Sequence, residues 1–254
     1  MYGAILGDMI GSIYEYGQLK DVHPITPQKL LTDDSFYSDD TILTIAILDA
    51  IQQNGDYEKF LKEYARRYQD YHPSYYSSFR SPFSSGFMKW VEGKKEGNST
   101  GNGALMRISP VGYMFDDVKD VKEQTKLATI PSHNSPEAIE SATTLALMIY
   151  YLRKGYSKEA VFGKLGITPN YTPFRHFNRT CGETLPNCLY AFYYSRNLED
   201  AYFRTLQFGG DTDTNCCIVG SLAEACYGVD DSYKKDVERV LPKEFVKVLK
   251  KDNR

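Results

Sequence analysis

The 254-residue chain is long enough to bury a sizeable core, and its 42% hydrophobic and 25% charged residues are typical of a soluble globular protein. Its formal net charge is -3 and no basic stripe stands out, which argues against nucleic-acid binding through bulk charge. The longest apolar stretch, 145–152, is too short to span a bilayer, and the first residues lack a signal-like pattern. We therefore expect a cytoplasmic protein without a membrane partner.

The five cysteines indicate free thiols in a reducing compartment. Their number is odd, they form no C-x-x-C pair, and three of them lie in one apolar segment near the C-terminus. This pattern favours neither a disulfide framework nor a zinc site. The residues are Cys181, Cys188, Cys216, Cys217 and Cys226.

The first segment, from Tyr2 to Tyr16, has apolar residues at helical spacing. Asp8 and Glu15 lie two turns apart on a second face of this predicted helix, with Gly11 and Ser12 between them. The two small residues would allow another backbone or a ligand to come close. Taken alone, the segment favours helix packing with two solvated acids at its edge.

The following segments predict further helices joined by loops. A loop over 21–36 leads into a helix from Thr41 to Gln53, and a second loop over 72–104 is long enough to suit a functional role. Further helices are expected at 57–71, 83–91, 117–128, 137–153, 157–165, 185–194, 198–206, 216–227 and in the tail 231–254. No stretch shows sustained period-two alternation, so the sequence predicts one compact all-α, multi-helix domain over residues 1–254.

Small residues dominate the string from Asn98 to Arg107. Successive backbone N–H groups in such a string could form an anion-binding concavity. The glycine spacing fits neither the dinucleotide fingerprint nor the P-loop, and the P-loop lysine is absent. By itself the string therefore favours a tight turn, and the lone His133 before the helix at 137–153 favours a structural hydrogen-bonding role.

Two acidic sequences precede the two most apolar predicted helices. Ser38-Asp39-Asp40-Thr41 leads into 42–48, and Gly209-Gly210-Asp211-Thr212-Asp213-Thr214-Asn215 leads into 216–227, with Asp213 or Thr214 as the expected cap. Capping requires one acid, whereas each sequence carries two. Carboxylates and hydroxyls suit Mg²⁺, Mn²⁺ or Ca²⁺, while zinc would favour His or Cys. The sequence thus predicts a divalent-cation site where the two helix starts meet.

Four motifs in a fixed order resemble the ADP-ribosylglycohydrolase family, over residues 3 to about 228. They are Gly7-Asp8-Met9-Ile10-Gly11-Ser12-Ile13-Tyr14-Glu15, Ser38-Asp39-Asp40-Thr41, Gly101-Asn102-Gly103-Ala104-Leu105-Met106-Arg107 and the Gly209–Asn215 sequence. The resemblance implies an all-α fold with a binuclear Mg²⁺ or Mn²⁺ centre. It also implies a hydrolase that removes ADP-ribose from a modified protein side chain by cleaving an N- or O-glycosidic bond at ribose C1″.

The same resemblance assigns roles to residues of this chain. It implies that the metal ligands are Ser38, Asp39, Asp40, Asp211, Asp213 and Thr214. It implies that backbone amides wrap the diphosphate at Ser99, Thr100, Gly101, Asn102 and Gly103, and that His133 contacts the substrate. Glu15 corresponds to an acid that contacts or gates the metal site. The chain departs from the family pattern at Ser38, where Thr is more usual, and at His133-Asn134-Ser135, where His-x-His is commoner.

The expected reaction passes through a transition state with oxocarbenium character. Two cations could hold the ribose hydroxyls and lower the pKa of a bound water. Glu15 or Asp40 would then position or deprotonate that water, and the sequence leaves this choice open. Two other functions also stay open, namely a non-catalytic ADP-ribose-binding relative and a hydrolase of another nucleotide-sugar or phosphoester bond. The expected partner is an ADP-ribosylated protein or an ADP-ribose derivative, and we expect a monomer.

Overall fold

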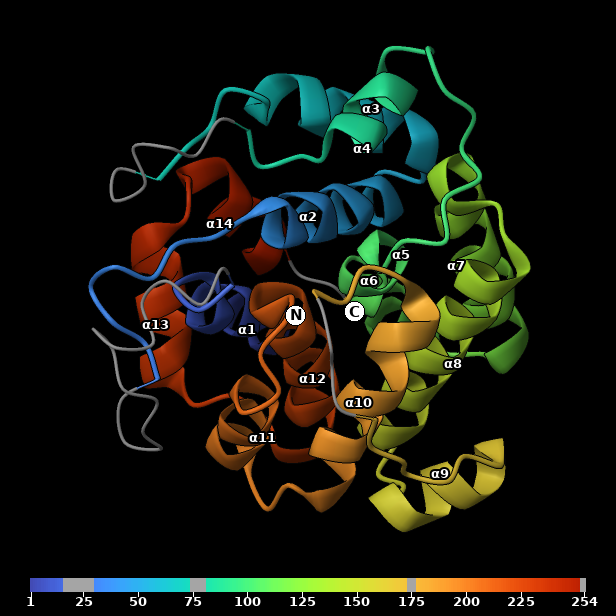
Figure 1. The fold of residues 1–254 in the computed structure, drawn as a ribbon, viewed down its shortest axis with the longest axis vertical. Helices are drawn as coiled ribbons and strands as arrows, with labels where there is room; N and C mark the ends of the chain where they lie inside the picture. The colour runs from blue at the N-terminus through green and yellow to red at the C-terminus, as the bar shows by residue number, and fades with distance from the viewer. Residues whose placement is uncertain (16–29, 74–80, 173–176, 252–254) are drawn as a thin grey trace.

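The structure is a computed structural model that describes residues 1–15, 30–73, 81–172 and 177–251. Within these ranges the regular structure is helical, apart from two isolated antiparallel bridges that pair Asn98 with His133 and Gly101 with Thr180. The prediction of an all-α fold is therefore confirmed (Figure 1). The helices are α1 (Tyr2–Ser12), α2 (Asp39–Gln52), α3 (Tyr57–Tyr68), α4 (Ser85–Val91), α5 (Gly103–Met106), α6 (Ser109–Met114), α7 (Val118–His133), α8 (Pro136–Arg153), α9 (Lys158–Leu165), α10 (Cys181–Tyr194), α11 (Leu198–Leu206), α12 (Thr212–Tyr227), α13 (Asp231–Val240) and α14 (Lys243–Lys250).

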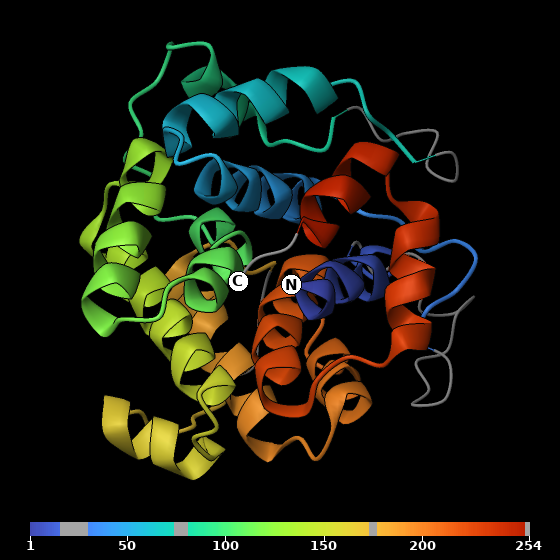
Figure 2. The ribbon, with the colours of Figure 1, turned by 180° about the vertical axis from the view of Figure 1, so that it is seen from behind.

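Helices α1 and α12 lie side by side at the centre of the molecule in both views (Figures 1 and 2). Glycines on α1 allow the two backbones to touch, because a Cβ built on Gly7 would lie 2.1 Å from the carbonyl oxygen of Cys216. One built on Gly11 would lie 2.2 Å from the carbonyl oxygen of Thr212. The Thr212 hydroxyl donates to the Gly11 carbonyl at 2.8 Å. The expected close approach of another backbone is confirmed, and it places the start of α12 beside the C-terminal half of α1.

Helix α2 packs on the central pair formed by α1 and α12, and further helices pack around these three. Helices α3 and α4 lie over α2 at the top of Figure 1, and α13 and α14 flank α1 and α2. Helices α7, α8 and α10 pack along the other side of the core, next to the short helices α5 and α6. The starts of α2 and α12 consequently face one interior region of the fold.

Several helix boundaries differ from the predicted ones. Helix α1 ends at Ser12, and α7 continues through Pro131 to His133 instead of ending near 128. Helix α10 begins at Cys181, four residues before the predicted start at Leu185, because Thr180 and Glu183 form a capping box. The short helix α5 lies within the string Asn98–Arg107 that was predicted as a tight turn, and α6 follows directly after it.

Some expectations fall outside the described residues. They are most of the predicted loop over 21–36, the predicted end of the first helix at Tyr16, and residues 74–80 of the second loop. The five cysteines all lie within the described ranges and are free, as predicted. None of the helices in these ranges combines the length and the apolar character that crossing a bilayer requires.

Candidate active site

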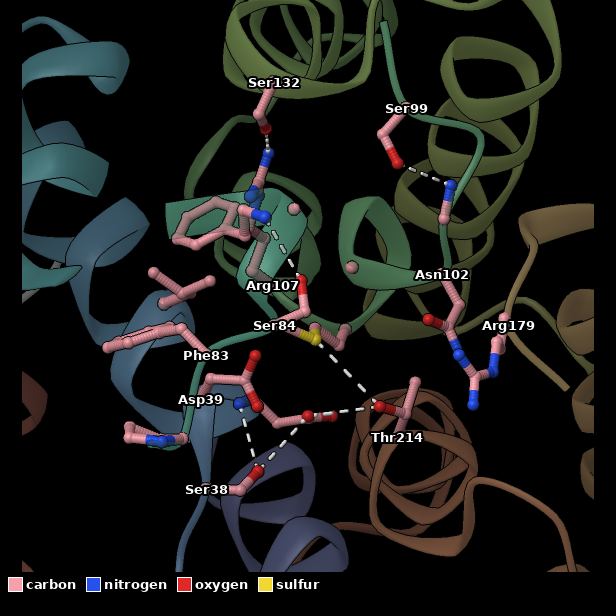
Figure 3. A pocket seen from close by; sticks show the side chains of 18 of the residues that line it. Ser38, Asp39, Phe83, Ser84, Ser99, Asn102, Arg107, Ser132, Arg179 and Thr214 are labelled. Atoms are coloured by element: carbon pink, nitrogen blue, oxygen red, sulfur yellow. Dashed lines mark hydrogen bonds between the residues drawn. The ribbon is translucent and has the colours of Figure 1, made fainter. Parts of the chain in front are cut away.

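A cavity of about 790 Å³ opens where the starts of α2 and α12 meet the segment 95–107 and the end of α7 (Figure 3). Nearly all of the residues with a role predicted from the sequence line this cavity. Its lining includes Glu15, Ser38, Asp39, Asp40, Ser99, Gly101, Asn102, Gly103, His133, Asp211, Asp213 and Thr214. Thr100 does not belong to this lining, and its carbonyl accepts a hydrogen bond from the Cys181 amide at 2.9 Å.

The floor of the cavity is acidic. Ligand oxygens of Asp8, Asp40 and Asp213 lie within 4.8 Å of one another, and the same holds for Glu15, Asp211 and Asp213. The two triplets share Asp213. Each of these groups could hold a cation, and one carboxylate belongs to both.

The Asp8 side chain, on α1, binds the start of α2 through hydrogen bonds. Its carboxylate accepts hydrogen bonds from the backbone N–H groups of Ser38 at 2.9 Å and Thr41 at 3.1 Å. It also accepts from the hydroxyls of Ser38 at 2.8 Å and Thr41 at 2.5 Å. Asp8 is 0% exposed, so the expectation of a solvated acid at the edge of the first helix was wrong for this residue. An acid within an otherwise apolar and small-residue helix was the sequence signal that could have identified it.

The start of α2 is capped by Ser38, whose hydroxyl accepts the Asp40 amide at 3.2 Å and lies 3.3 Å from the Asp40 carboxylate. The Thr214 hydroxyl donates to the same Asp40 carboxylate, to Oδ2, at 3.1 Å, which joins α12 to α2 (Figure 3). The predicted convergence of the two acidic helix starts is thus present in the fold.

The start of α12 differs from the expected cap. The N-cap residue is Asp211, and its side chain makes no capping bond to the described backbone, whereas Asp213 Oδ1 accepts the adjacent Thr214 amide at 2.8 Å. Gly209 and Gly210 have φ values of 68° and 72°, which glycine adopts without strain, and they turn the chain into the helix. The Asp211 carboxylate instead accepts from Asn102 Nδ2 at 2.7 Å.

The segment 97–103 is held between the end of α7 and the start of α10. The amides of Ser99, Gly101 and Asn102 donate to the Ser132 carbonyl, the Ser99 hydroxyl and the Arg179 carbonyl at 3.2, 3.0 and 2.9 Å. These three amides therefore already have acceptors within the protein. The backbone cradle for a diphosphate at 99–103 stays a prediction.

Arg107 lines the cavity wall and was missed as a functional candidate. It is 1% exposed, and its Nη2 donates to the Ser132 hydroxyl at 2.7 Å. The same hydroxyl lies 2.7 Å from Nδ1 of His133. Burial, then Arg107 and Lys95, lower the pKa of His133 well below its usual value, so the imidazole is neutral.

The wall away from the carboxylates is aromatic and basic. Phe83 and Trp90 both contact Phe87, with ring centroids 5.7 and 5.3 Å from it, and Lys95 and Arg179 add positive charge. Phe83, Ser84 and Asp39 all line the cavity (Figure 3). These aromatic residues come from the long loop and from α4, which lies within the helix predicted over 83–91.

Comparison with known proteins identifies the family. The sequence model described as ADP-ribosylglycohydrolase matches residues 1–252. The chain belongs to the ADP-ribosylglycohydrolase family. Membership makes it an enzyme that hydrolyses glycosidic bonds.

Individual members are distant in sequence. Human ADP-ribosylhydrolase ARH3 is 22% identical over 307 residues, covering 90% of this chain and 84% of the relative. ADP-ribosylarginine hydrolase Tri1 of Pseudomonas putida is 21% identical, covering 98% of this chain and 75% of the relative. A solved structure described as an ADP-ribosylglycohydrolase-related protein complex superposes with a TM-score of 0.70 at 21% identity and covers 94% of each chain. The fold is therefore that of the family.

The electrostatics of this ADP-ribosylglycohydrolase site fit a bound cation. Burial raises the pKa of Asp8 and of Asp211 to about 6. Burial and neighbouring carboxylates raise the pKa of Asp39, Asp40 and Asp213 well above the usual value. Within the described ranges, buried Oδ1 of Asp40 has no hydrogen-bond partner. An unpartnered carboxylate oxygen in an oxygen-only cluster is a suitable ligand for Mg²⁺ or Mn²⁺.

These raised pKa values make the stability of the metal-free enzyme depend on pH. A carboxyl with a pKa of about 6 in the fold, as for Asp8 and Asp211, keeps its proton between about pH 4 and pH 6 while the unfolded chain releases it. The folded state then binds more protons, so the free energy of unfolding falls as the pH rises, by of the order of 2 kcal/mol per group. Urea unfolding of metal-free enzyme over this pH interval measures the change.

Added Mg²⁺ or Mn²⁺ is expected to offset this loss above about pH 6, because a bound cation favours the ionised carboxylates of the folded state. A metal-free enzyme that becomes more stable as the pH rises would contradict the prediction. So would a stability that neither ion changes.

Proposed function

We propose that this enzyme removes ADP-ribose from a modified protein side chain by hydrolysing the bond between ribose C1″ and a side-chain nitrogen or oxygen. Two divalent cations, Mg²⁺ or Mn²⁺, are its proposed cofactors. Their proposed ligands are Ser38, Asp39, Asp40, Asp211, Asp213 and Thr214, with Asp8 as the residue that orients Ser38. The names of human ARH3 and of Tri1 from Pseudomonas putida, which describe hydrolases of ADP-ribose linkages, support this reaction class.

The observation that carries the proposal is the acidic floor of a cavity large enough for ADP-ribose. Ligand pockets of about 300–1,000 Å³ enclose molecules of this size. The carboxylates of Asp39, Asp40, Asp211 and Asp213 line this floor together, and Oδ1 of Asp40 lacks a partner among the described residues. Burying carboxylates this close together costs free energy unless their negative charge is neutralised. A resident cation pair accounts for both features.

The opposite wall suits the nucleotide part of the substrate. The aromatic rings of Phe83, Phe87 and Trp90 provide flat apolar surface, and Arg179 and Lys95 provide positive charge for a diphosphate. The side-chain amide of Asn102 donates to the Asp211 carboxylate at the acidic floor. We propose that Ser99, Thr100, Gly101, Asn102, Gly103 and His133 contact the bound ADP-ribose.

Glu15 is the proposed general base. Asp40 is buried, and its Oδ2 accepts the Thr214 hydroxyl, so it is better suited to hold a cation. Glu15 lines the cavity, is only partly buried, and belongs to the triplet with Asp211 and Asp213. When bound, divalent cations supply Lewis acidity and neutralise the carboxylates. Glu15 accepts a proton from the attacking water as the bond from C1″ to the side-chain nitrogen or oxygen breaks, and this proton is then available to the departing atom.

The test is release of ADP-ribose by the purified enzyme with Mg²⁺ or Mn²⁺. Protein modified on arginine, peptide modified on serine, and free ADP-ribose derivatives are compared as substrates. Release is expected from a protein-linked substrate, and Asp211→Ala and Asp213→Ala are expected to lose both metal and activity. Full activity without bound metal would overturn the proposed centre.

Two other outcomes would point to the alternative functions. Tight ADP-ribose binding without turnover of any substrate would indicate a recognition module. Hydrolysis confined to another nucleotide sugar or to a phosphoester would indicate a different substrate class for the same carboxylates.

A further inference from the structure

We infer that Arg107 and Ser132 are positioning residues that hold His133 as its Nε2–H tautomer, so that a neutral donor faces the cavity and binds an oxyanion of the ligand. The ligand in this inference rests on the proposed function, whereas the tautomer does not.

The guanidinium of Arg107 can only donate. Its Nη2 lies 2.7 Å from the Ser132 hydroxyl oxygen, so this oxygen accepts one hydrogen bond. Arg107 remains protonated at neutral pH, since burial lowers its pKa only to about 10. The direction of the first hydrogen bond is therefore fixed by chemistry.

The Ser132 hydroxyl has one proton to donate. Its oxygen lies 2.7 Å from Nδ1 of His133, and the described residues offer it no third partner. If Nδ1 carried a proton, the hydroxyl proton would have no acceptor in a buried position, which is costly. Nδ1 is therefore the acceptor, and the neutral ring carries its proton on Nε2.

The Nε2 edge of the ring faces the turn from Gly101 to Gly103. A Cβ built on Gly103 would lie 3.3 Å from Nε2 of His133, and one built on Gly101 would lie 3.6 Å from it. Both glycines and His133 line the cavity. Because these positions have no side chains, the Nε2–H group remains accessible to a ligand that enters along the turn.

A neutral donor has a physical advantage at this site. Arg107 and Lys95 already supply positive charge, and both lower the pKa of His133. The chain from Arg107 through Ser132 polarises the imidazole without adding a second buried cation. The donor therefore keeps one orientation, whether or not the ligand is present.

The tautomer is tested by NMR of full-length enzyme with ¹⁵N-labelled histidine. Long-range ¹H–¹⁵N spectra distinguish Nδ1–H from Nε2–H, and His133→Gln identifies the signal among the four histidines. The expected wild-type result is a neutral ring protonated at Nε2. A wild-type ring protonated at Nδ1 would overturn the inference, and this measurement needs neither a variant nor enzyme activity.

The positioning role is tested with Ser132→Ala. We expect its His133 signals to shift toward the other tautomer and its Kd for free ADP-ribose to rise about tenfold, because the donor loses its fixed orientation. Ser132→Thr keeps the hydroxyl and is expected to restore both. Ser221→Ala is the matched control, since Ser221 is also buried and its hydroxyl donates only to the Ile218 carbonyl among the described residues. Unchanged spectrum and affinity in Ser132→Ala would overturn the role.

Failure of the proposed function gives a different result. A wild-type enzyme that neither binds ADP-ribose nor releases it from protein would reject the proposed substrate. The NMR result for His133 would still decide the tautomer in that case.

Discussion

Replacing Asp40 with Asn is expected to lower kcat/KM for release of ADP-ribose by about 10³-fold. The amide keeps the shape of the side chain but removes one negative charge from the triplet that Asp40 forms with Asp8 and Asp213. A bound cation that is lost or misplaced costs several kcal/mol of transition-state stabilisation, and about 4 kcal/mol corresponds to this factor. Steady-state kinetics with metal analysis of the purified variant measure the effect.

The same variant is expected to be more stable than the wild type in its metal-free form. Asp40 is buried among carboxylates whose pKa values are raised, and Oδ1 has no partner among the described residues. Removing this unfavourable charge should raise the free energy of unfolding at neutral pH by about 1–2 kcal/mol. Loss of activity together with gain of apo stability is a combination that general damage to the fold does not produce.

The matched control is Asp231→Asn, which makes the same chemical change on the surface. The Asp231 side chain is 84% exposed and pairs with Lys234 one turn away. Such an exposed pair contributes little to stability because water and salt screen it, and kcat/KM is expected to stay unchanged. If Asp40→Asn also kept full activity, the proposed cation site would be wrong.

The second large effect is expected from Gly7→Ala. The added Cβ would lie 2.1 Å from the Cys216 carbonyl oxygen, so α1 and α12 must move apart. We expect a loss of about 3 kcal/mol in the free energy of unfolding, because backbone atoms at this contact cannot yield as a flexible side chain would. In a chain of this size the loss lowers Tm by roughly 6–12 °C.

Gly7→Ala is also expected to weaken metal binding, because Asp8 and Asp213 lie on the two helices that separate. Thermal unfolding and Mn²⁺ titration of the same preparation measure both effects. Gly163→Ala is the control, since Gly163 lies in α9 and a Cβ there meets nothing within 4 Å. It is expected to stabilise the enzyme by about 0.5–1 kcal/mol through helix propensity. A Gly7→Ala enzyme as stable as the wild type would contradict the proposed backbone contact.

Local patterns were sufficient to predict most helices and the two acidic helix starts. The apolar runs of α2 and α12 indicate buried helices, and the hydroxyls and carboxylates before them are the ligand types that hard cations prefer. The same patterns misplaced the start of α10 and the cap of α12, because both depend on which polar groups are near in space. Asp211, for instance, bonds to Asn102, which is 109 residues away in the sequence.

The role of Asp8 could not be read from its own segment. A helix with one acid among apolar and small residues is compatible with a solvated edge or with a buried anchor. Only the packing of α2 on α1 brings four donors from Ser38 and Thr41 to this carboxylate. Arg107, Ser132 and His133 were likewise separate features until the fold placed the Arg107 side chain beside the end of α7.

The sequence by itself determined the all-α class, the free cysteines and the chemical type of the site, because periodicity and ligand preference are properties of short segments. Only the tertiary structure decided which carboxylates lie close together, which amides of 99–103 are already bonded, and which side chains contact Nδ1 of His133. These outcomes depend on distances between residues far apart in the chain. Such distances are set by the close packing of α1, α2 and α12, and no local pattern encodes them.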